Sequence, residues 1–536
     1  MKTGFCNGKI YQGKGEYCST LLIEDGKIVY AGNGEGVSFE DYEMTDLNGK
    51  TVIPGLNDSH MHLFSLAMTY AQAKIRDSRS KKELLEISKK FIEENPELVK
   101  NGLSARGFNN DYFTDGTVLP TCKDLDEVST AIPVVLDRVC GHTCCVNSLA
   151  LKMMDEKYGL DNLPEAEVVK GEDGKPNGVF TENSVFKCLS LVPPFDADTR
   201  KSLIMKAMEY LVSTGVTTVQ GNDLNDFEND DVIKGILKDL YENDEALIRY
   251  YAQCCFGDDE YESFKRVLEN DRYHLPYESD MIKIGPLKLY KDGSLGARTA
   301  QLYNDYNDEP GNTGIEVHTP EEMYEFTKLA NEHGVAVCTH CIGDRAIDET
   351  ADAYAKADET KTNPCRNTIN HCQITDMKIL NKIADNNILV SYQPIFLEFD
   401  LHMVEDRVGK TLGDTSYAYK TLKGLGVHTS YGTDCPIEDC NGFMNLHCAV
   451  NRTDFNNLPV GGYNPSECMS LEEAIDCYTY ESAYNQFEEE RKGLLKEGYF
   501  ADLVVLEEDI FNMDPLKLKD VKPLMTIVNG KVVFKR

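Results

Sequence analysis

Residues 52–62 read VIPGLNDSHMH, an apolar run that leads into two histidines, His60 and His62. In a β-strand, side chains two residues apart project to the same side. We therefore expect both imidazoles to face inward at the carboxyl end of one strand, where they would form half of a site for zinc or a similar divalent ion. An isolated pair of this spacing is weak evidence, because most such pairs are surface histidines. Whether the two histidines form part of a metal site therefore depends on the residues in the rest of the chain.

Seven further apolar runs follow, and helical stretches separate most of them. They are GVTTVQGND (215–223), LIRYYAQCC (247–255), IKIGPLKLYKDG (282–293), VAVCTHC (335–341), NTINHC (367–372), ILVSYQP (388–394) and VHTSYGTD (427–434). Each run is apolar enough to be buried on both faces, as parallel strands are. Between them, residues 320–334 carry helix signals, with Glu321 and Glu322 in the first turn and Gly334 just past the end. Eight alternating β/α units predict an α/β fold, a closed (β/α)₈ barrel of the TIM type.

The regions outside the runs predict two additional parts. Residues 72–199 form a large α/β insertion after the first strand, with a helical segment at 81–94 and a strand-like one at 131–139. An insertion at this point emerges at the catalytic face, where it is expected to cap the site. Residues 1–53 and 491–536 each contain a hairpin signal, and either hairpin alone would be marginally stable. We predict that the two ends form one small β-sandwich, which leaves 54–71 and 200–490 for the barrel.

Three further residues of metal-binding type stand at or next to the end of later runs. His340 ends the fifth run, His371 the sixth and Asp434 the eighth. Each of them alone could be a core histidine or a helix-capping aspartate. The chain has only 11 histidines, so four of them at the ends of predicted strands would be an unusual coincidence. This is also the face on which barrel enzymes place their chemistry.

Lys288 lies between two leucines in the fourth run, where a charged lysine would be costly unless it were paired. One interpretation is that it pairs with an acidic neighbour or reaches the solvent at the mouth of the barrel. The other is that its amine is carboxylated, which turns it into an anion that bridges two metal ions.

The composition excludes some classes of partner. A formal net charge of −35 argues against binding nucleic acid or an anionic membrane, since both would repel such a surface. The 18 cysteines show no disulfide framework or structural zinc pattern, and residues 1–17 lack the apolar core of a signal peptide. We expect a cytoplasmic protein that acts on a small molecule, with a homodimer as the commonest form of assembly.

Several motifs together resemble one known family. They are PGLNDSHMH (54–62), KLYKDGSLGARTA (288–300), THCIGDRAID (339–348), INHCQIT (369–375), SYQPIF (391–396) and GTDCPIED (432–439), with GHTCCVNSLAL (141–151) and GVFTE (178–182) in the insertion. As a set they resemble the amidohydrolase superfamily, and within it the family 3 branch that includes N-substituted formamide deformylases. The likeness spans essentially the whole chain.

The resemblance implies a role for each candidate residue. His60 and His62 would bind the more buried metal ion, with Asp434 as a further ligand and as the general base. His340 and His371 would bind a second ion, or orient substrate if only one ion is present, and Lys288 matches the carboxylated lysine of related enzymes. Further residues would assist catalysis or contact substrate or the ligands: His142, Asp344, Arg345 and Gln393.

The implied activity is hydrolysis of a carbon–nitrogen bond by metal-activated water. One or two divalent ions are expected, zinc first, although iron, manganese or nickel would suit these ligands. An N-acyl, N-formyl or cyclic amide is the substrate class by analogy. A deaminase of the same superfamily is the alternative, although the segment after His340 offers Asp344 and no glutamate in the place such enzymes use. A non-catalytic barrel and a metal-storing protein are less consistent with a full set of ligands at strand ends.

Overall fold

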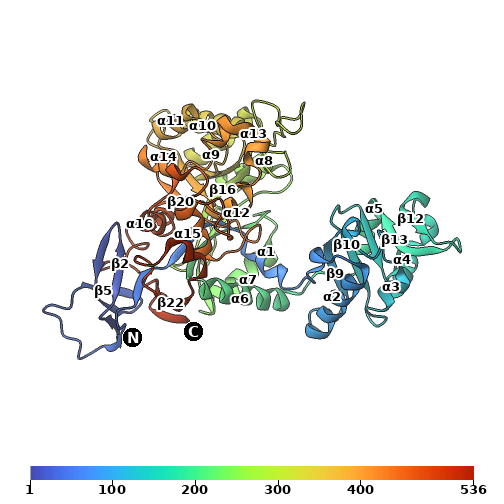
Figure 1. Ribbon diagram of the computed structural model, residues 1–536, viewed down its shortest axis with the longest axis horizontal. Coiled ribbons are helices and arrows are strands. Elements are labelled where there is room, and N and C mark those ends of the chain that lie inside the picture. Colours follow the sequence, from blue (N-terminus) through green and yellow to red (C-terminus); the bar gives the residue numbers. More distant parts are fainter. Residues whose placement is uncertain (1) are drawn as a thin grey trace. The chain divides into compact units, whose positions relative to one another are not determined.

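The computed structural model describes residues 2–536, and the chain divides into two compact units (Figure 1). The first consists of Met1–Leu66 and Ile204–Arg536, and the second of Ala67–Leu203. Three of the four sheets lie in the first unit and one in the second, and each unit has hydrophobic clusters of its own.

The first unit contains an eight-stranded parallel sheet in which neighbouring strands follow one another along the chain. The strands are β8 (Leu56–Met61), β14 (Val216–Leu224), β15 (Arg249–Cys254), β16 (Ile282–Tyr290), β17 (Val337–Cys341), β18 (Thr368–His371), β19 (Leu389–Tyr392) and β20 (Thr429–Tyr431). Each of the eight apolar runs supplies one strand, which confirms the predicted α/β barrel. The helix predicted before β17 is also present, as α9 (Pro320–Glu332), with a capping box between Thr319 and Glu322.

The segment that follows β20 closes the barrel against β8. The backbone N–H of Asp434 donates to the carbonyl of His60 at 2.7 Å, and that of His62 donates to the carbonyl of Cys435 at 2.8 Å. Gly432 permits this close approach, since a Cβ atom there would lie 2.5 Å from the backbone nitrogen of His60. Closure of the barrel therefore brings His60, His62 and Asp434 together, although Asp434 is far from the other two in sequence.

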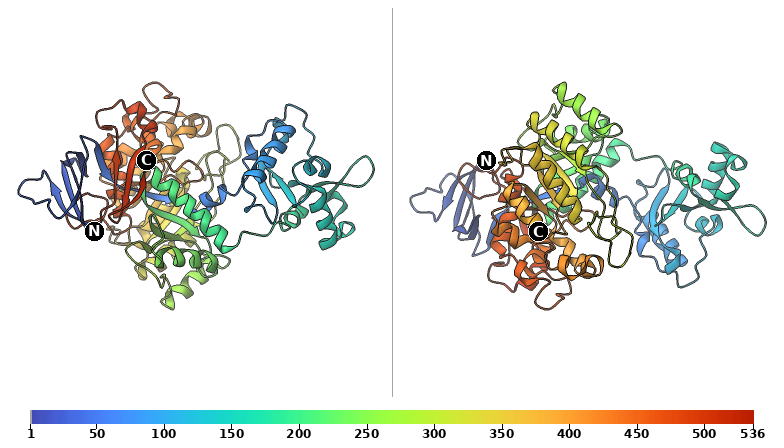
Figure 2. Two further views of the ribbon diagram at one scale, coloured as in Figure 1. Left: turned by 90° about the horizontal axis from the view of Figure 1, so that it is seen from below. Right: turned by 90° about the horizontal axis from the view of Figure 1, so that it is seen from above.

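Both termini contribute to a β-sandwich, as predicted. A six-stranded sheet runs in the order β23 (Lys531–Lys535), β22 (Pro523–Val528), β21 (Leu503–Leu506), β7 (Thr51–Pro54), β2 (Lys9–Gly13) and β3 (Glu16–Cys18). A four-stranded sheet runs in the order β5 (Lys27–Gly32), β4 (Thr20–Glu24), β1 (Lys2–Cys6) and β6 (Glu43–Asp46). One hydrophobic core takes residues from both ends, including Phe5, Leu21 and Leu503. The blue strand β7 pairs with the red strand β21, and the left view of Figure 2 shows blue and red strands side by side.

Both predicted hairpin turns are present in this sandwich. Asp25 and Gly26 join β4 to β5 with φ angles of 48° and 81°, and Asn529 and Gly530 join β22 to β23 with 52° and 73°. Two successive positive φ angles define the type I′ turn, whose twist matches that of the flanking strands.

A buried ion pair fastens the sandwich to the barrel. Nε of Arg249, the first residue of β15, lies 2.6 Å from Oδ2 of Asp502, and the two side chains are only 2% and 7% exposed. The sandwich thus contacts the amino end of a barrel strand. The carboxyl ends of the strands, where the candidate residues lie, are at the opposite end of the barrel.

The second unit lies between β8 and β14 in sequence and is a folded α/β unit. Its five-stranded sheet runs in the order β12 (Val168–Lys170), β13 (Pro176–Thr181), β11 (Thr143–Val146), β10 (Val134–Arg138) and β9 (Leu103–Phe108). The predicted helical segment forms α2 (Lys81–Glu94), and the strand-like segment forms β10. The large α/β insertion is thereby confirmed, while its expected position over the catalytic face stays a prediction.

Candidate metal centre

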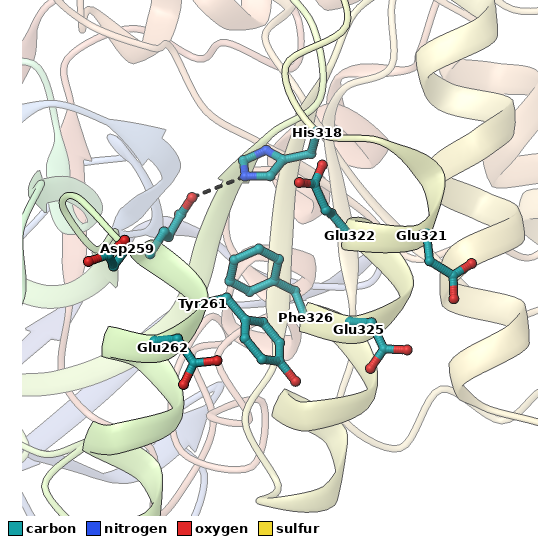
Figure 3. Close-up of a pocket in the computed structure, with 9 residues that line it drawn as sticks. Asp259, Tyr261, Glu262, His318, Glu321, Glu322, Glu325 and Phe326 are labelled. Atoms are coloured by element: carbon teal, nitrogen blue, oxygen red, sulfur yellow. Dashed lines mark hydrogen bonds and ion pairs between the residues drawn. The ribbon is translucent and has the colours of Figure 1, made fainter.

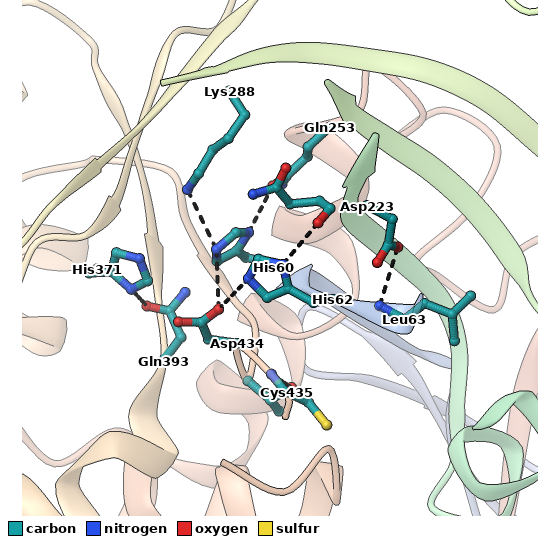
Figure 4. Close-up of polar contacts among 12 residues, drawn as sticks. His60, His62, Leu63, Asp223, Gln253, Lys288, His371, Gln393, Asp434 and Cys435 are labelled. Carbon is teal, nitrogen blue, oxygen red and sulfur yellow. Dashed lines mark hydrogen bonds and ion pairs between the residues drawn. The ribbon is translucent and has the colours of Figure 1, made fainter. Parts of the chain in front are cut away.

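Six candidate residues from five different barrel strands or strand ends meet at the carboxyl end of the barrel, and Figure 4 shows all of them except His340. They are His60, His62, Lys288, His340, His371 and Asp434. Oδ1 of Asp434 lies 3.0 Å from Nε2 of His62 and 3.4 Å from Nε2 of His60. The ring of His371 is centred 5.5 Å from that of His60 and 4.4 Å from that of His340.

Gln253 at the end of β15 fixes the orientation of the His60 ring. Its amide nitrogen donates to the carbonyl of Ser59 at 3.1 Å, so its oxygen Oε1 must face Nδ1 of His60, 2.7 Å away. Nδ1 therefore carries the ring proton and donates it to Gln253. The lone pair of Nε2 is left facing Asp434 and Lys288, which is the orientation a metal ligand requires.

Gln393 holds His371 in the same way. The glutamine amide nitrogen donates to the carbonyl of Ser391 at 3.2 Å, and its oxygen lies 2.6 Å from Nδ1 of His371. Nε2 of His371 is buried and has no hydrogen-bond partner among residues 2–536. A buried polar atom without a partner is costly, so this nitrogen points to a bound ion that would accept its lone pair.

Backbone carbonyls orient the other two histidines. Nδ1 of His62 lies 2.8 Å from the carbonyl oxygen of Asn222 and Nε2 of His340 lies 3.0 Å from that of Gly293. Both nitrogens of His62 thus face oxygen acceptors, because Asp434 lies on its other side. A neutral ring would direct a lone pair at one of these two oxygen atoms. A cation between His62 and Asp434, either a proton or a metal ion, removes this repulsion.

Burial keeps three of the rings neutral. It lowers the pKa of His60 and of His371 well below the usual value and lowers the pKa of His340 to about 4, with the positive charge of Lys288 acting in the same direction on all three. The pKa of His62 is raised, because the hydrogen bond and charge of Asp434 outweigh the effect of burial. Neutral imidazoles beside a carboxylate form a donor set that suits zinc and similar ions.

His60, His371 and Asp434 meet the geometric requirement for a shared ion, since each has a ligand atom within 4.8 Å of those of the other two. The backbone supports this placement. His371 and Asp434 have positive φ angles of 74° and 57°, a region that most residues avoid and that recurs at functional sites. These residues fit a divalent ion.

Lys288 is fully buried, and its Nζ lies 3.5 Å from Nε2 of His60. It forms no ion pair within the described chain; its nitrogen lies 5.1 Å from the ring centre of Tyr290. Neither an acidic partner among residues 2–536 nor exposure to solvent, the two possibilities of the first interpretation, is found for Lys288. Among neutral imidazoles, an ammonium group has little to offset its desolvation.

Several buried carboxylates and amides that organise this site were missed by the sequence analysis. Asp58 accepts a hydrogen bond from the Thr433 hydroxyl at 2.6 Å, and Asp223 accepts one from the backbone N–H of Phe64 at 2.8 Å. Asp292 accepts backbone N–H groups of the loop that follows His340. Like Gln253, Asp223 and Asp292 lie near the carboxyl ends of strands, whereas Asp58 lies two residues before His60 in β8. The same positional rule, applied to Asp and Gln as well as to His, would have found them.

The remaining predicted residues, as far as the structure describes their surroundings, have partners other than the clustered rings. Asp344 begins α10 (Asp344–Ala357) and accepts a hydrogen bond from the backbone N–H of Tyr303 at 3.1 Å, and Arg345 donates to Glu349 at 2.8 Å. His142 lies in the second unit, where it is exposed and 3.2 Å from Glu182. Contact of these three residues with substrate stays a prediction.

A separate cavity of about 530 Å³ lies beside α8 (Glu260–Glu269) and α9, as Figure 3 shows. His318 lies at its edge, 3.0 Å from Glu260, and the lining includes further glutamates such as Glu321 and Glu325. None of the six candidate residues lines it. The cavity is therefore distinct from the candidate metal centre.

Comparison of the sequence and the structure with known proteins gives relatives that agree with a metal centre of this geometry. A sequence profile described as "Amidohydrolase family" matches residues 43–534. The chain belongs to the amidohydrolase family. It is 30% identical to the Bacillus subtilis protein YtcJ, with both chains covered in full. This amidohydrolase also matches the crystal structure of a metal-dependent hydrolase from Pyrococcus furiosus, with a TM-score of 0.75 and 28% identity over 96% of this chain and 100% of the other.

A third relative is named for its substrate. It is an N-substituted formamide deformylase of Arthrobacter pascens, 22% identical, with 99% of this chain and 97% of the relative covered. Together with the barrel and the cluster of histidines and aspartate, these likenesses identify the chain as a metal-dependent hydrolase of the amidohydrolase family. Nothing long and apolar enough to cross a membrane occurs among the helices of residues 2–536.

Proposed function

We propose that this amidohydrolase cleaves the carbon–nitrogen bond of a non-peptide amide, with an N-acyl, N-formyl or cyclic amide as substrate. The observation that carries the proposal is the convergence of imidazole lone pairs on Asp434, with the buried Nε2 of His371 left without a partner. The deformylase relative supports the choice of an amide over other substrates.

The residues that would hold the metal are His60, His62 and Asp434, with Lys288, His340 and His371 available for a second ion. A bound divalent ion, zinc by preference, would lower the pKa of water to about 7 and polarise the scissile carbonyl. Asp434 would remove a proton from the attacking water and deliver it to the leaving nitrogen. If only one ion is bound, His340 and His371, whose rings are centred 4.4 Å apart, would instead orient the carbonyl oxygen.

The test is hydrolysis by protein that has been stripped of metal and then reloaded with zinc, iron, manganese or nickel in turn. We expect at least one reloaded form to release formate or carboxylate from a panel of N-formyl, N-acyl and cyclic amides. The stripped protein should be inactive, since water itself is a poor nucleophile. Ammonia release from aminopurines and aminopyrimidines, with no amide turnover, would instead indicate a deaminase and contradict the proposal.

The burial of Lys288 without an acidic partner supports a carboxylated side chain that bridges two ions. Replacing Lys288 with methionine keeps the length of the side chain and removes the amine. We expect the bound metal to fall by about one ion per chain, because one bridging ligand is lost. Elemental analysis of the purified proteins measures this directly.

Labelling separates carboxylation from a simple structural role of Lys288. Wild-type protein reloaded in isotope-labelled bicarbonate should show a carbamate signal by nuclear magnetic resonance, and Lys288→Met should show none. Lys328→Met, an exposed lysine of α9, serves as the matched control and should keep both the signal and the metal. Equal metal content in Lys288→Met and wild type, with no carbamate in either, would contradict carboxylation.

A further inference from the structure

A cavity of about 220 Å³ opens at the carboxyl end of the barrel, and we call it the side pocket. Loops that follow β16, β17, β18, β19 and β20 all contribute to its wall. Most of the lining is apolar: Leu295, Ile342, Phe396, Phe399, Met403 and Ile437. An apolar cavity of about 150 Å³ accommodates benzene, so the side pocket has room for a ring with a short substituent.

The side pocket shares walls with the candidate metal centre. The ring of Phe396 lies parallel to that of His371, with an interplanar angle of 6° and 5.9 Å between centroids. The backbone N–H of Ile437 donates to the carbonyl of Asp434 at 2.9 Å. A group bound in the side pocket would therefore belong to a molecule whose reacting bond lies at the metal centre.

One wall of the side pocket carries carboxyl groups. Asp400 accepts hydrogen bonds from the Tyr417 hydroxyl at 2.6 Å and from Gln373 at 3.3 Å, both through Oδ2. Glu438 also lines the pocket, and within residues 2–536 its carboxylate forms no ion pair and no hydrogen bond. Glu438 is thus a partly buried carboxyl group without a partner in the described chain, at the edge of an apolar surface.

The surroundings of Glu438 are unfavourable to its charge. Burial raises the pKa of Glu438 to about 7, and the neighbouring charges of Asp400 and Glu398 act in the same direction. Burial likewise raises the pKa of Asp400 to about 6. A positive charge in the pocket would relieve both effects, whereas a neutral or anionic ligand would leave the carboxylates uncompensated.

We propose that the side pocket binds an aromatic or branched alkyl group that carries a cationic nitrogen, with Glu438 as its counter-ion. The inference rests on the proposed function and narrows it to amides whose substituent bears an ammonium group. The apolar wall would hold the ring, and Phe399, whose side chain is exposed at the rim, would cover it. Glu438 would then determine specificity without taking part in the chemistry.

Binding can be tested apart from turnover with benzyltrimethylammonium, which has no lone pair to offer a metal ion. Calorimetric titration of the metal-loaded enzyme should show tighter binding of this cation than of benzyl alcohol. In Glu438→Gln the affinity for the cation should fall about tenfold, because a partly buried charge pair is lost. The affinity for benzyl alcohol should stay unchanged.

Two further variants make the binding test specific. Phe399→Ala should weaken the binding of both ligands, because the ring of the ligand loses apolar contact without any change of charge. Glu490→Gln replaces an exposed glutamate of the same unit and should leave the affinity for both ligands unchanged. Equal affinities of the wild type for the cation and the alcohol, or an unchanged cation affinity in Glu438→Gln, would overturn the proposal.

The matching kinetic test compares two formamides, N-[para-(aminomethyl)benzyl]formamide and its neutral para-ethyl analogue. We expect a higher kcat/KM for the cationic substrate in the wild type, and loss of the preference in Glu438→Gln. Hydrolysis of both formamides at equal kcat/KM would overturn the side-pocket proposal and leave the hydrolase function standing. Selective binding of the cation with no hydrolysis of any amide would contradict the hydrolase function and leave the side-pocket proposal standing.

Discussion

Replacing Asp434 with asparagine is expected to reduce kcat by about 10³-fold or more while the protein stays folded. General-base catalysis contributes about 10²–10⁴-fold, and asparagine cannot take up the proton. The substitution is nearly isosteric, and asparagine tolerates the left-handed conformation of this residue, whose φ is 57°. The backbone hydrogen bond to His60 that closes the barrel is also retained.

The measurement is single-turnover hydrolysis together with metal content. We expect Asp434→Asn to keep metal, since the histidines remain and an amide oxygen can still coordinate. Asp385→Asn, an exposed aspartate on α11 (Met377–Asp385), should behave as wild type. Turnover of Asp434→Asn near the wild-type rate would show that another group is the base.

The second large effect is expected for His60→Asn. This change removes a buried ligand atom and leaves Gln253 without the ring nitrogen that it contacts at 2.7 Å. The metal site then loses one donor atom, and the residues that contacted the ring lose the contact that orients them. We expect metal content to drop below one ion per chain and activity to fall to the level of the stripped wild type.

Thermal unfolding distinguishes loss of metal from loss of fold. A metal ion at 100 times its dissociation constant stabilises the native state by about 2.7 kcal/mol, so the wild type should show a higher Tm with metal than without. His60→Asn should unfold near the stripped wild type and show no such rise. His318→Asn, a histidine outside the centre, should keep the rise. A metal-dependent Tm in His60→Asn would exclude His60 as an essential ligand.

Much of the fold could be predicted because it depends on local patterns. The eight barrel strands are continuous apolar runs, because the side chains on both faces of a parallel strand are buried and are therefore mostly apolar. The Asp25–Gly26 and Asn529–Gly530 turns were predictable because their φ angles favour those residue types. The H-x-H pair, too, was readable from strand periodicity.

The supports of the candidate site were not predictable in the same way. Gln253 was not predicted, and Gln393 was predicted only as a residue that contacts substrate or the ligands. The contacts of both with the histidine rings depend on the carbonyls that fix their amide orientation. Asp58 and Asp292 are distinguished from other aspartates only by burial and by the N–H and O–H groups that surround them. These partners come from distant segments of the chain, so a position near a strand end can single out such a residue but cannot show which group it holds in place.

By itself, then, the sequence determined the barrel, the sandwich from both termini, the insertion and the kinds of side chain at the strand ends, since strand periodicity and turn chemistry are local. Only the tertiary structure decided that Asp434 lies against His60, that Lys288 is buried without an acidic partner in the described chain, and that Glu438 faces an apolar pocket. Those facts depend on closure of the barrel, which fixes distances between residues that are hundreds of positions apart.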